Sequence, residues 1–140
     1  MACVLWLAGA YNLAWGAWVV LFPKAMFRLA DMPPPNYPQL WQCIGMIVGV
    51  YGVAYAIAAT DPLRHWGIVL VGLMGKVFGP IGFVHAAARG ELPWTFGLTC
   101  LGNDLIWWVP FGLILWRAFR QRDVTARRPG DTAPPHHAEP

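Results

Sequence analysis

The chain has 140 residues, of which 57% are hydrophobic and 12% charged, with a formal net charge of +3. This length leaves no room for a soluble catalytic domain beside a membrane domain. The charged residues gather in a few short stretches, which excludes an ordinary soluble surface and requires lipid or a large partner. Half of the Lys and Arg residues lie between Arg117 and Arg128. Without interleaved aromatics, that cluster favours anionic lipid headgroups over nucleic acid.

Four apolar segments are long enough to cross a bilayer, which takes about 20 residues. The sequence therefore predicts an all-α fold, an antiparallel four-helix transmembrane bundle in residues 1–120, followed by a disordered tail in residues 121–140. The first segment has neither a basic leader nor a small-residue cleavage site, so we expect it to remain as a membrane helix. The predicted helices span about residues 3–22, 40–60, 66–88 and 95–117.

The breaks between these segments contain residues that interrupt helices. Residues 23–39 include Pro33-Pro34-Pro35, which predicts a non-helical, extended cover at the membrane interface. Residues 61–65 predict a tight turn, and residues 89–93 contain a glycine suited to end one helix and a proline suited to begin the next. Connections this short make consecutive helices antiparallel neighbours.

The distribution of positive charge predicts the orientation, because basic loops stay on the cytoplasmic side. Arg64 and the five arginines from Arg117 to Arg128 share the side of both termini, whereas Lys24, Arg28 and Arg89 lie on the other side. We therefore expect both termini in the cytoplasm and the chain in the bacterial cytoplasmic membrane.

Two charged residues fall inside the predicted spans, where an ionised side chain costs several kcal/mol. Lys76 lies roughly 15 Å from the inner end of its helix, and Asp104 lies roughly 14 Å from the opposite face, at 1.5 Å per residue. Equal depth on neighbouring helices predicts an ion pair, and Asn12 and Asn103 reach the same layer. Two interpretations stay open: an interhelical clamp, or a proton, ion or ligand site.

Two prolines free backbone carbonyls near this layer. Pro80 cannot donate to the carbonyl of Lys76, and Pro110 cannot donate to that of Ile106. Broken helices beside a charge pair resemble the ion sites of transporters, although prolines also kink membrane helices for packing alone. Tyr51 is level with the pair and shares a helix face with Tyr55, a face that would equally suit lipid.

Other polar residues give weaker indications. Gln42 and His85 both fall in the outer half of the bundle and predict a shallow polar mouth, with an interfacial histidine as the alternative. The three cysteines are far apart, which indicates neither a metal site nor a dithiol centre. No cofactor motif is evident. Trp107-Trp108, beside Asp104, would suit a planar ligand such as a quinone, or would fill the bundle.

Small residues recur on one face of the second and third segments. Such stripes let helix backbones approach closely, and tight packing within or between subunits is the interpretation that we favour. We expect Gly16 and Asn12 of the first segment to join this packing. The stripe residues are Gly45, Gly49, Gly52, Gly72, Gly75, Gly79 and Gly82.

The membrane part of the chain, roughly residues 11–111, resembles small bacterial four-helix membrane proteins of the DoxX-like class. That resemblance implies a four-helix bundle and carries no assigned activity. Some such proteins bear an alkyl hydroperoxide reductase label, which implies a thioredoxin-like domain that this sequence lacks. The resemblance rests on Tyr11-Asn12-Leu13, Trp15-Gly16, Trp41-Gln42, Gly45-Met46, Gly49-Val50-Tyr51-Gly52, Asp61-Pro62, Gly75-Lys76, Gly79-Pro80, Asn103-Asp104 and Trp107-Trp108.

Two functions follow as hypotheses. Small size, glycine stripes and the lack of a catalytic constellation favour an accessory or assembly subunit of a larger membrane complex, one linked to redox chemistry, over an enzyme. Its partners would be the lipid bilayer and other membrane subunits or further copies of itself. The alternative is an independent small transporter or quinone-linked membrane protein that works at Lys76 and Asp104.

Overall fold

The computed structural model describes residues 1–126, with side chains up to Arg122, and all the regular structure in this part is helical. Helices α1 (Ala2–Leu21), α3 (Pro38–Thr60) and α4 (Trp66–Ala88) are each long and apolar enough to cross a membrane. Residues Trp94–Arg122 form a fourth such span. The predicted all-α four-helix fold is thus confirmed, and the bounds of the first three helices differ from prediction by at most two residues.

The first connection is partly helical. Helix α2 (Ala25–Leu29) occupies a segment that the sequence predicted to be extended, so that prediction is wrong for these five residues. Residues 32–37, which hold the proline run, are non-helical as predicted. Pro38 then opens α3, because a proline in the first helical turn lacks only a donor that would have no intrahelical partner there.

The fourth span is composite, where the sequence predicted one regular helix. It comprises a 3₁₀ turn η1 (Trp94–Phe96), a short α5 (Gly97–Cys100), a π-helical turn η2 (Leu101–Leu105) and the long α6 (Ile106–Ala126). Residues 121–126 are helical, so the disordered tail predicted from residue 121 is wrong over those positions. Extending an existing helix costs little, and the Arg122 guanidinium also lies 4.9 Å from the centre of the Trp66 ring. The rest of the predicted tail, 127–140, lies outside the described residues.

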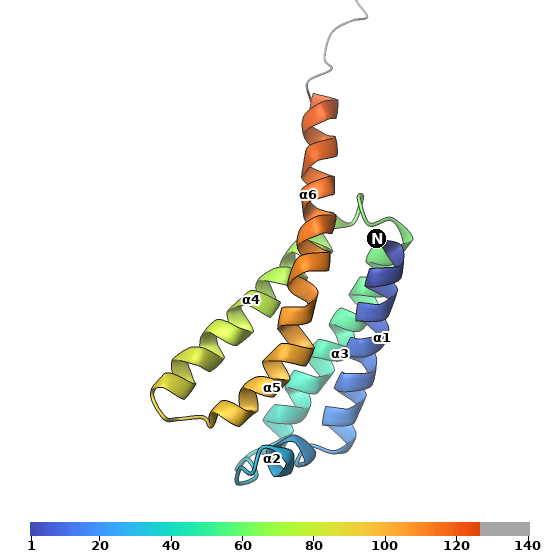
Figure 1. Ribbon diagram of the computed structural model, residues 1–140. Helices are drawn as coiled ribbons and strands as arrows, with labels where there is room; N and C mark the ends of the chain where they lie inside the picture. The colour runs from blue at the N-terminus through green and yellow to red at the C-terminus, as the bar shows by residue number, and fades with distance from the viewer. Residues whose placement is uncertain (127–140) are drawn as a thin grey trace, which may run out of the picture.

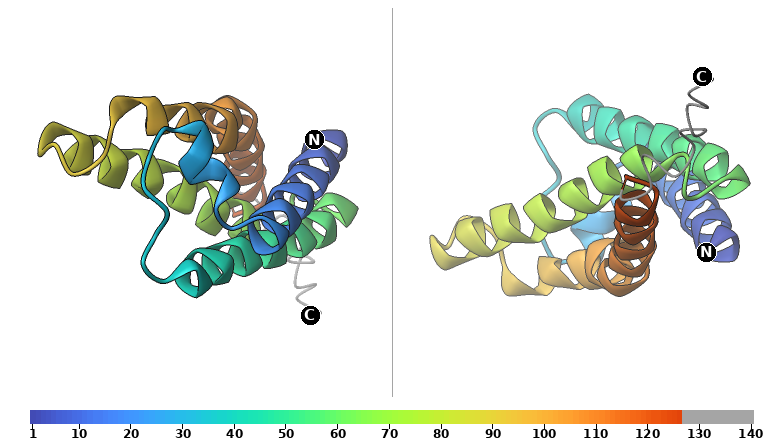
Figure 2. Two further views of the ribbon diagram at one scale, coloured as in Figure 1. Left: turned by 90° about the horizontal axis from the view of Figure 1, so that it is seen from below. Right: turned by 90° about the horizontal axis from the view of Figure 1, so that it is seen from above.

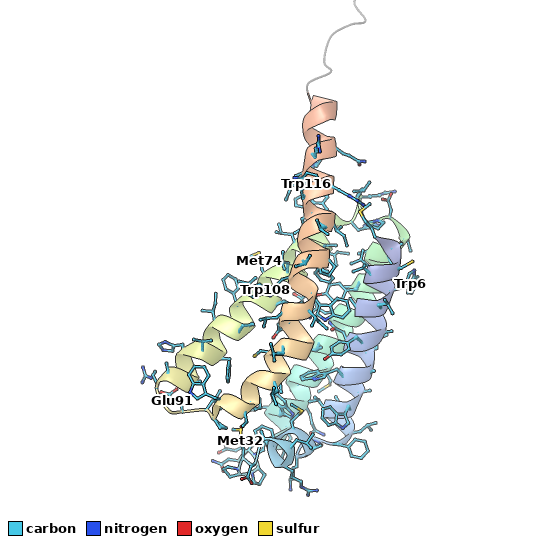
Figure 3. All side chains as sticks on the ribbon, in the orientation of Figure 1. Trp6, Met32, Met74, Glu91, Trp108 and Trp116 are labelled. Carbon is cyan, nitrogen blue, oxygen red and sulfur yellow. The ribbon has the colours of Figure 1, made fainter. Side chains whose placement is uncertain are left out.

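The spans form two pairs. Helix α1 runs beside α3, and α4 packs against η2, α5 and α6 (Figure 1). From the turn at 61–65, α4 leans away from α3 toward its far end (Figures 1 and 2). The N-terminus, this turn and the end of α6 share one end of the molecule. Trp6 and Trp116 lie toward that end, and Met32 and Glu91 lie at the other (Figure 3).

Backbone contact between α1 and α3 depends on glycine. A Cβ on Gly16 would lie 2.5 Å from the Gly45 carbonyl oxygen, and one on Gly9 would lie 2.9 Å from that of Gly52. A Cβ on Gly49 would itself meet no atom within 4 Å, although Gly16 lies against its backbone. These two helices therefore pack backbone against backbone, more closely than either packs on α4 or α6.

Candidate functional site

Three polar or charged residues are buried in the part of the chain with described side chains. Asn12 of α1 is 2% exposed, Lys76 of α4 is 5% exposed, and Asp104 of η2 is 8% exposed. All three line one cavity of about 180 Å³, together with Asn103, Tyr51 and other residues of α3 and α4. The structure thus brings together the four residues that the sequence placed in one midplane layer.

The charges of Lys76 and Asp104 are linked through Asn103. Lys76 Nζ donates a hydrogen bond of 2.5 Å to the Asn103 carbonyl oxygen, and Asn103 Nδ2 donates one of 3.1 Å to Asp104 Oδ1. Within residues 1–122, the ion pair closer than 4.0 Å is the surface pair Arg89–Glu91, so the direct Lys76–Asp104 pair predicted from depth alone is wrong. The physical reason is that the π-helical turn presents a backbone carbonyl to the ammonium group first.

The carbonyl that Pro80 frees is not left without a donor. Trp108 Nε1 donates a hydrogen bond of 3.0 Å to the Lys76 carbonyl oxygen across the α4–α6 contact. Trp107 is 8% exposed, and its ring centre lies 5.9 Å from Lys76 Nζ, within range of a cation–π interaction. The sequence suggested that the two tryptophans stack on a ligand or fill the bundle. In the structure, Trp107 contacts the ammonium group of Lys76 and Trp108 contacts its backbone carbonyl.

Polar atoms at this layer remain without partners. The Oδ1 atoms of Asn12 and Asn103 are both buried and accept no hydrogen bond from the described residues. A buried acceptor without a donor costs about 1–3 kcal/mol. Since both asparagines line the cavity, a molecule held there would supply the missing donors.

The π-helical turn shapes the carboxylate end of the site. Turns of this kind are rare in proteins, and those that occur are often at functional sites. Asp104 faces α4 at Gly79, where a Cβ would lie 3.4 Å from Asp104 Oδ2. The carboxylate thus packs at van der Waals distance from this position of α4, accepts from the Asn103 amide and is 8% exposed.

Tyr55 and Tyr51 belong to the cavity wall. Tyr55 is 1% exposed and makes an edge-to-face contact with Phe111, their ring centres 5.1 Å apart, so the lipid-facing alternative is wrong for this residue. Gly72 packs directly on the Tyr55 ring, whereas Cβ atoms on Gly75 and Gly82 would meet nothing within 4 Å. The α4 glycines thus divide into contacting and open positions.

Gln42 and His85 do not line this cavity. Gln42 Nε2 donates a hydrogen bond of 2.8 Å to the Val20 carbonyl oxygen near the end of α1. His85 is exposed on the part of α4 that leans away from α3. No three His, Cys, Asp or Glu side chains gather as a metal site among the residues that the structure describes.

Some residues of the site carried no sequence signal. Ile47 and Val48 line the cavity as ordinary apolar residues of a span, and the donor role of Trp108 depends on how α4 and α6 meet. The shared face of Tyr51 and Tyr55 was a usable signal, because buried tyrosines seek a polar partner.

Comparisons of the chain with models of known families, with curated proteins and with solved structures give no match. The similarity to DoxX-like proteins therefore stays a prediction, and the conclusion that the structure carries is a four-helix integral membrane protein with a polar cavity among its spans.

Proposed function

We propose that the protein binds a small membrane-soluble molecule in the midplane cavity, as an independent transporter or a quinone-linked membrane protein would. The observation that supports this most is the Asn12 side chain, which is 2% exposed and lines the cavity with an unpartnered Oδ1. A purely structural clamp has no need of an orphaned acceptor beside an open volume. Charged side chains buried in a span also mark ligand and ion pathways.

The size and walls of the cavity suit one ring. A cavity of about 150 Å³ accommodates benzene, and this one measures about 180 Å³. Tyr51 and Tyr55 supply aromatic wall, while Lys76 offers a donor to a ligand carbonyl. A quinone headgroup has this shape and can accept from Lys76, and its reduced quinol form also carries the hydroxyl donors that Asn12 Oδ1 and Asn103 Oδ1 lack.

Binding is tested with the purified protein in nanodiscs and a short-chain quinone that quenches tryptophan fluorescence. We expect saturable quenching whose Kd rises at least tenfold in Lys76→Met. Arg89→Met, which removes an exposed cation at the end of the same helix, serves as the control and should bind like wild type. Identical titrations for all three proteins would contradict the proposal.

A second candidate is the accessory or assembly subunit of a larger membrane complex. It is favoured by the open glycines Gly75 and Gly82 of α4, which lie seven residues apart and so on the same helix face. Membrane helices associate through small residues of this kind. Comigration with a large complex in mild detergent, lost in Gly82→Leu, would support this role, and a discrete small species in wild type would contradict it. The bacterial cytoplasmic membrane is the location that we propose for either function.

A further inference from the structure

The cavity opens sideways, toward lipid. Ile47 of α3 is 59% exposed and Gly75 of α4 is exposed, yet both line the cavity. Gly75 is near the middle of the 23-residue α4, and a Cβ there would meet no atom within 4 Å. The opening between these two residues therefore lies at the depth of the hydrocarbon.

The end of the bundle that holds the N-terminus and the turn at 61–65 is filled by apolar packing. The buried residues that fill it come from all four spans, and the largest of them are almost completely inaccessible. Apart from the Tyr55 hydroxyl and the Trp107 indole N–H, the buried residues of this cluster carry no polar side-chain atom. This plug includes Leu5, Tyr55, Val69, Phe111 and Ile114.

The other end is closed by aromatic rings. Trp41 of α3 lies at the centre of this cluster, with ring centres 5.3 Å from Phe27, 6.0 Å from Trp15 and 6.3 Å from Phe96. These rings join α1, the α2 segment, α3 and η1 into a cap. A separate hollow of about 250 Å³ beside Phe96 shares no lining residue with the polar cavity, so the lateral opening is the route that exposed cavity-lining residues mark.

The charges that face the cavity balance. Lys76 and Asp104 bring one formal positive and one formal negative charge, and the remaining polar groups there are amides and phenols. An anionic head would lie beside Asp104 and a cationic head beside Lys76, each at a cost in a medium without water. An uncharged head leaves this balance intact and can donate to Asn12 Oδ1 while it accepts from Lys76.

We propose that the ligand enters from the bilayer through the opening between Ile47 and Gly75, and that it is an uncharged amphipathic molecule whose polar head both donates and accepts hydrogen bonds. This inference rests on the proposed binding function and adds the route and the ligand class. The apolar part of such a molecule remains in the lipid between α3 and the leaning α4, so only its head has to be desolvated.

The test uses a long-chain alcohol with a diazirine beside the hydroxyl group, and the matching carboxylic acid and amine. After photolysis in nanodiscs, mass spectrometry counts adducts on cavity-lining peptides. We expect the alcohol to label wild type at least tenfold more than the acid or the amine. Gly75→Leu, which fills the opening, should lower alcohol labelling at least tenfold. Gly82→Leu is the matched control, because it adds the same side chain to an equally open position outside the cavity.

Ile47→Trp fills the same opening from α3 and replaces Gly75→Leu if that variant does not fold. Stronger labelling by the acid or the amine would overturn the neutral ligand class. Wild-type labelling in Gly75→Leu and Ile47→Trp, together with loss in Lys76→Met, would overturn the lateral route and leave the binding function standing. Equal labelling of wild type and Lys76→Met would instead refute the binding function itself. Equal loss in Gly75→Leu and Gly82→Leu would also overturn the route, because it would assign both glycines to helix docking.

Discussion

Lys76 holds its position through three different neighbours. Its ammonium group donates to the Asn103 carbonyl and lies over Trp107, and its own carbonyl accepts from Trp108. The link from Asn103 to Asp104 is the hydrogen bond that the Asn103 side-chain amide donates to Asp104 Oδ1. Lys76 and Asp104 are therefore coupled indirectly, through the backbone carbonyl and the side-chain amide of Asn103.

Removing one charge of this pair should destabilise the protein more than removing both. Lys76→Met or Asp104→Leu alone leaves one charge in the hydrocarbon, at a cost of about 2.5–3.5 kcal/mol on insertion scales. We expect each single variant to yield less folded protein than the double variant, measured by fluorescence-detected size exclusion. The same cycle at Arg89 and Glu91, whose side chains are 63% and 54% exposed, should show no such recovery. Single variants with wild-type yield would argue against the coupling.

Gly72 is predicted to be the least replaceable glycine of α4. A Cβ there would press on the Tyr55 ring, 2.7 Å from Cε1, and Tyr55 cannot retreat because Phe111 lies behind it. Gly72→Ala should cost about 1–3 kcal/mol, the usual range for overpacking. Gly82→Ala should lower the thermal midpoint in detergent much less, since its Cβ meets nothing. Equal midpoints for the two variants would contradict this contact.

At the scale of helices, α6 repairs the break in α4. Pro80 removes the amide that would have bonded to the Lys76 carbonyl, and Trp108 replaces it from the facing helix. An interhelical hydrogen bond thus takes the place of the missing bond at Pro80, and it fixes the depth of α4 relative to α6.

This repair predicts a compensating pair of substitutions. Trp108→Phe should destabilise the protein by about 0.6–2 kcal/mol, because it leaves a freed carbonyl without a donor in the membrane. Pro80→Ala restores an amide donor within α4, so the double variant should be more stable than Trp108→Phe alone. Thermal unfolding of the four proteins measures the coupling. Strict additivity of the two changes would mean that the hydrogen bond contributes nothing.

Hydropathy predicted the spans well, because the need to bury about 20 apolar residues in lipid is local to each segment. The composite fourth span was not predictable in the same way. Residues 101–105 hold no residue type that distinguishes a π-helical turn from an ordinary helix, and the contact of their Asn103 carbonyl with Lys76 comes from a different helix. The same holds for the candidate site. The depth of each residue in its span predicted which residues lie together, whereas their hydrogen-bond partners depend on how the helices pack.

For the whole molecule, the shared end of the two helical termini agrees with the antiparallel order that short connections impose. The lean of α4 away from α3 could not be predicted, because lipid and protein are equally apolar to a helix face. It is this lean that leaves Gly75 open and the cavity accessible.

Both termini are predicted to be cytoplasmic. Arg64 and the arginines from Arg117 to Arg128 outnumber Lys24, Arg28 and Arg89 on the opposite side, and basic segments are retained in the cytoplasm. A C-terminal alkaline phosphatase fusion should therefore be inactive, while a fusion placed in the 89–93 turn should be active. The reverse pattern would invert the topology without altering the fold.

The π-helical turn has a consequence for how the fourth span tolerates insertions and deletions. One residue corresponds to a rotation of about 100° around an α-helix. The π-helical turn at residues 101–105 accommodates one extra residue by widening. Deleting a single residue there would return the segment to a regular α-helix and leave the faces on either side nearly in phase, whereas a deletion within α6 would rotate them by about 100°. Asp104 and the buried row Trp107, Phe111 and Ile114 follow one another at intervals of three and four residues, so a deletion before Asp104 would leave them on one helix face.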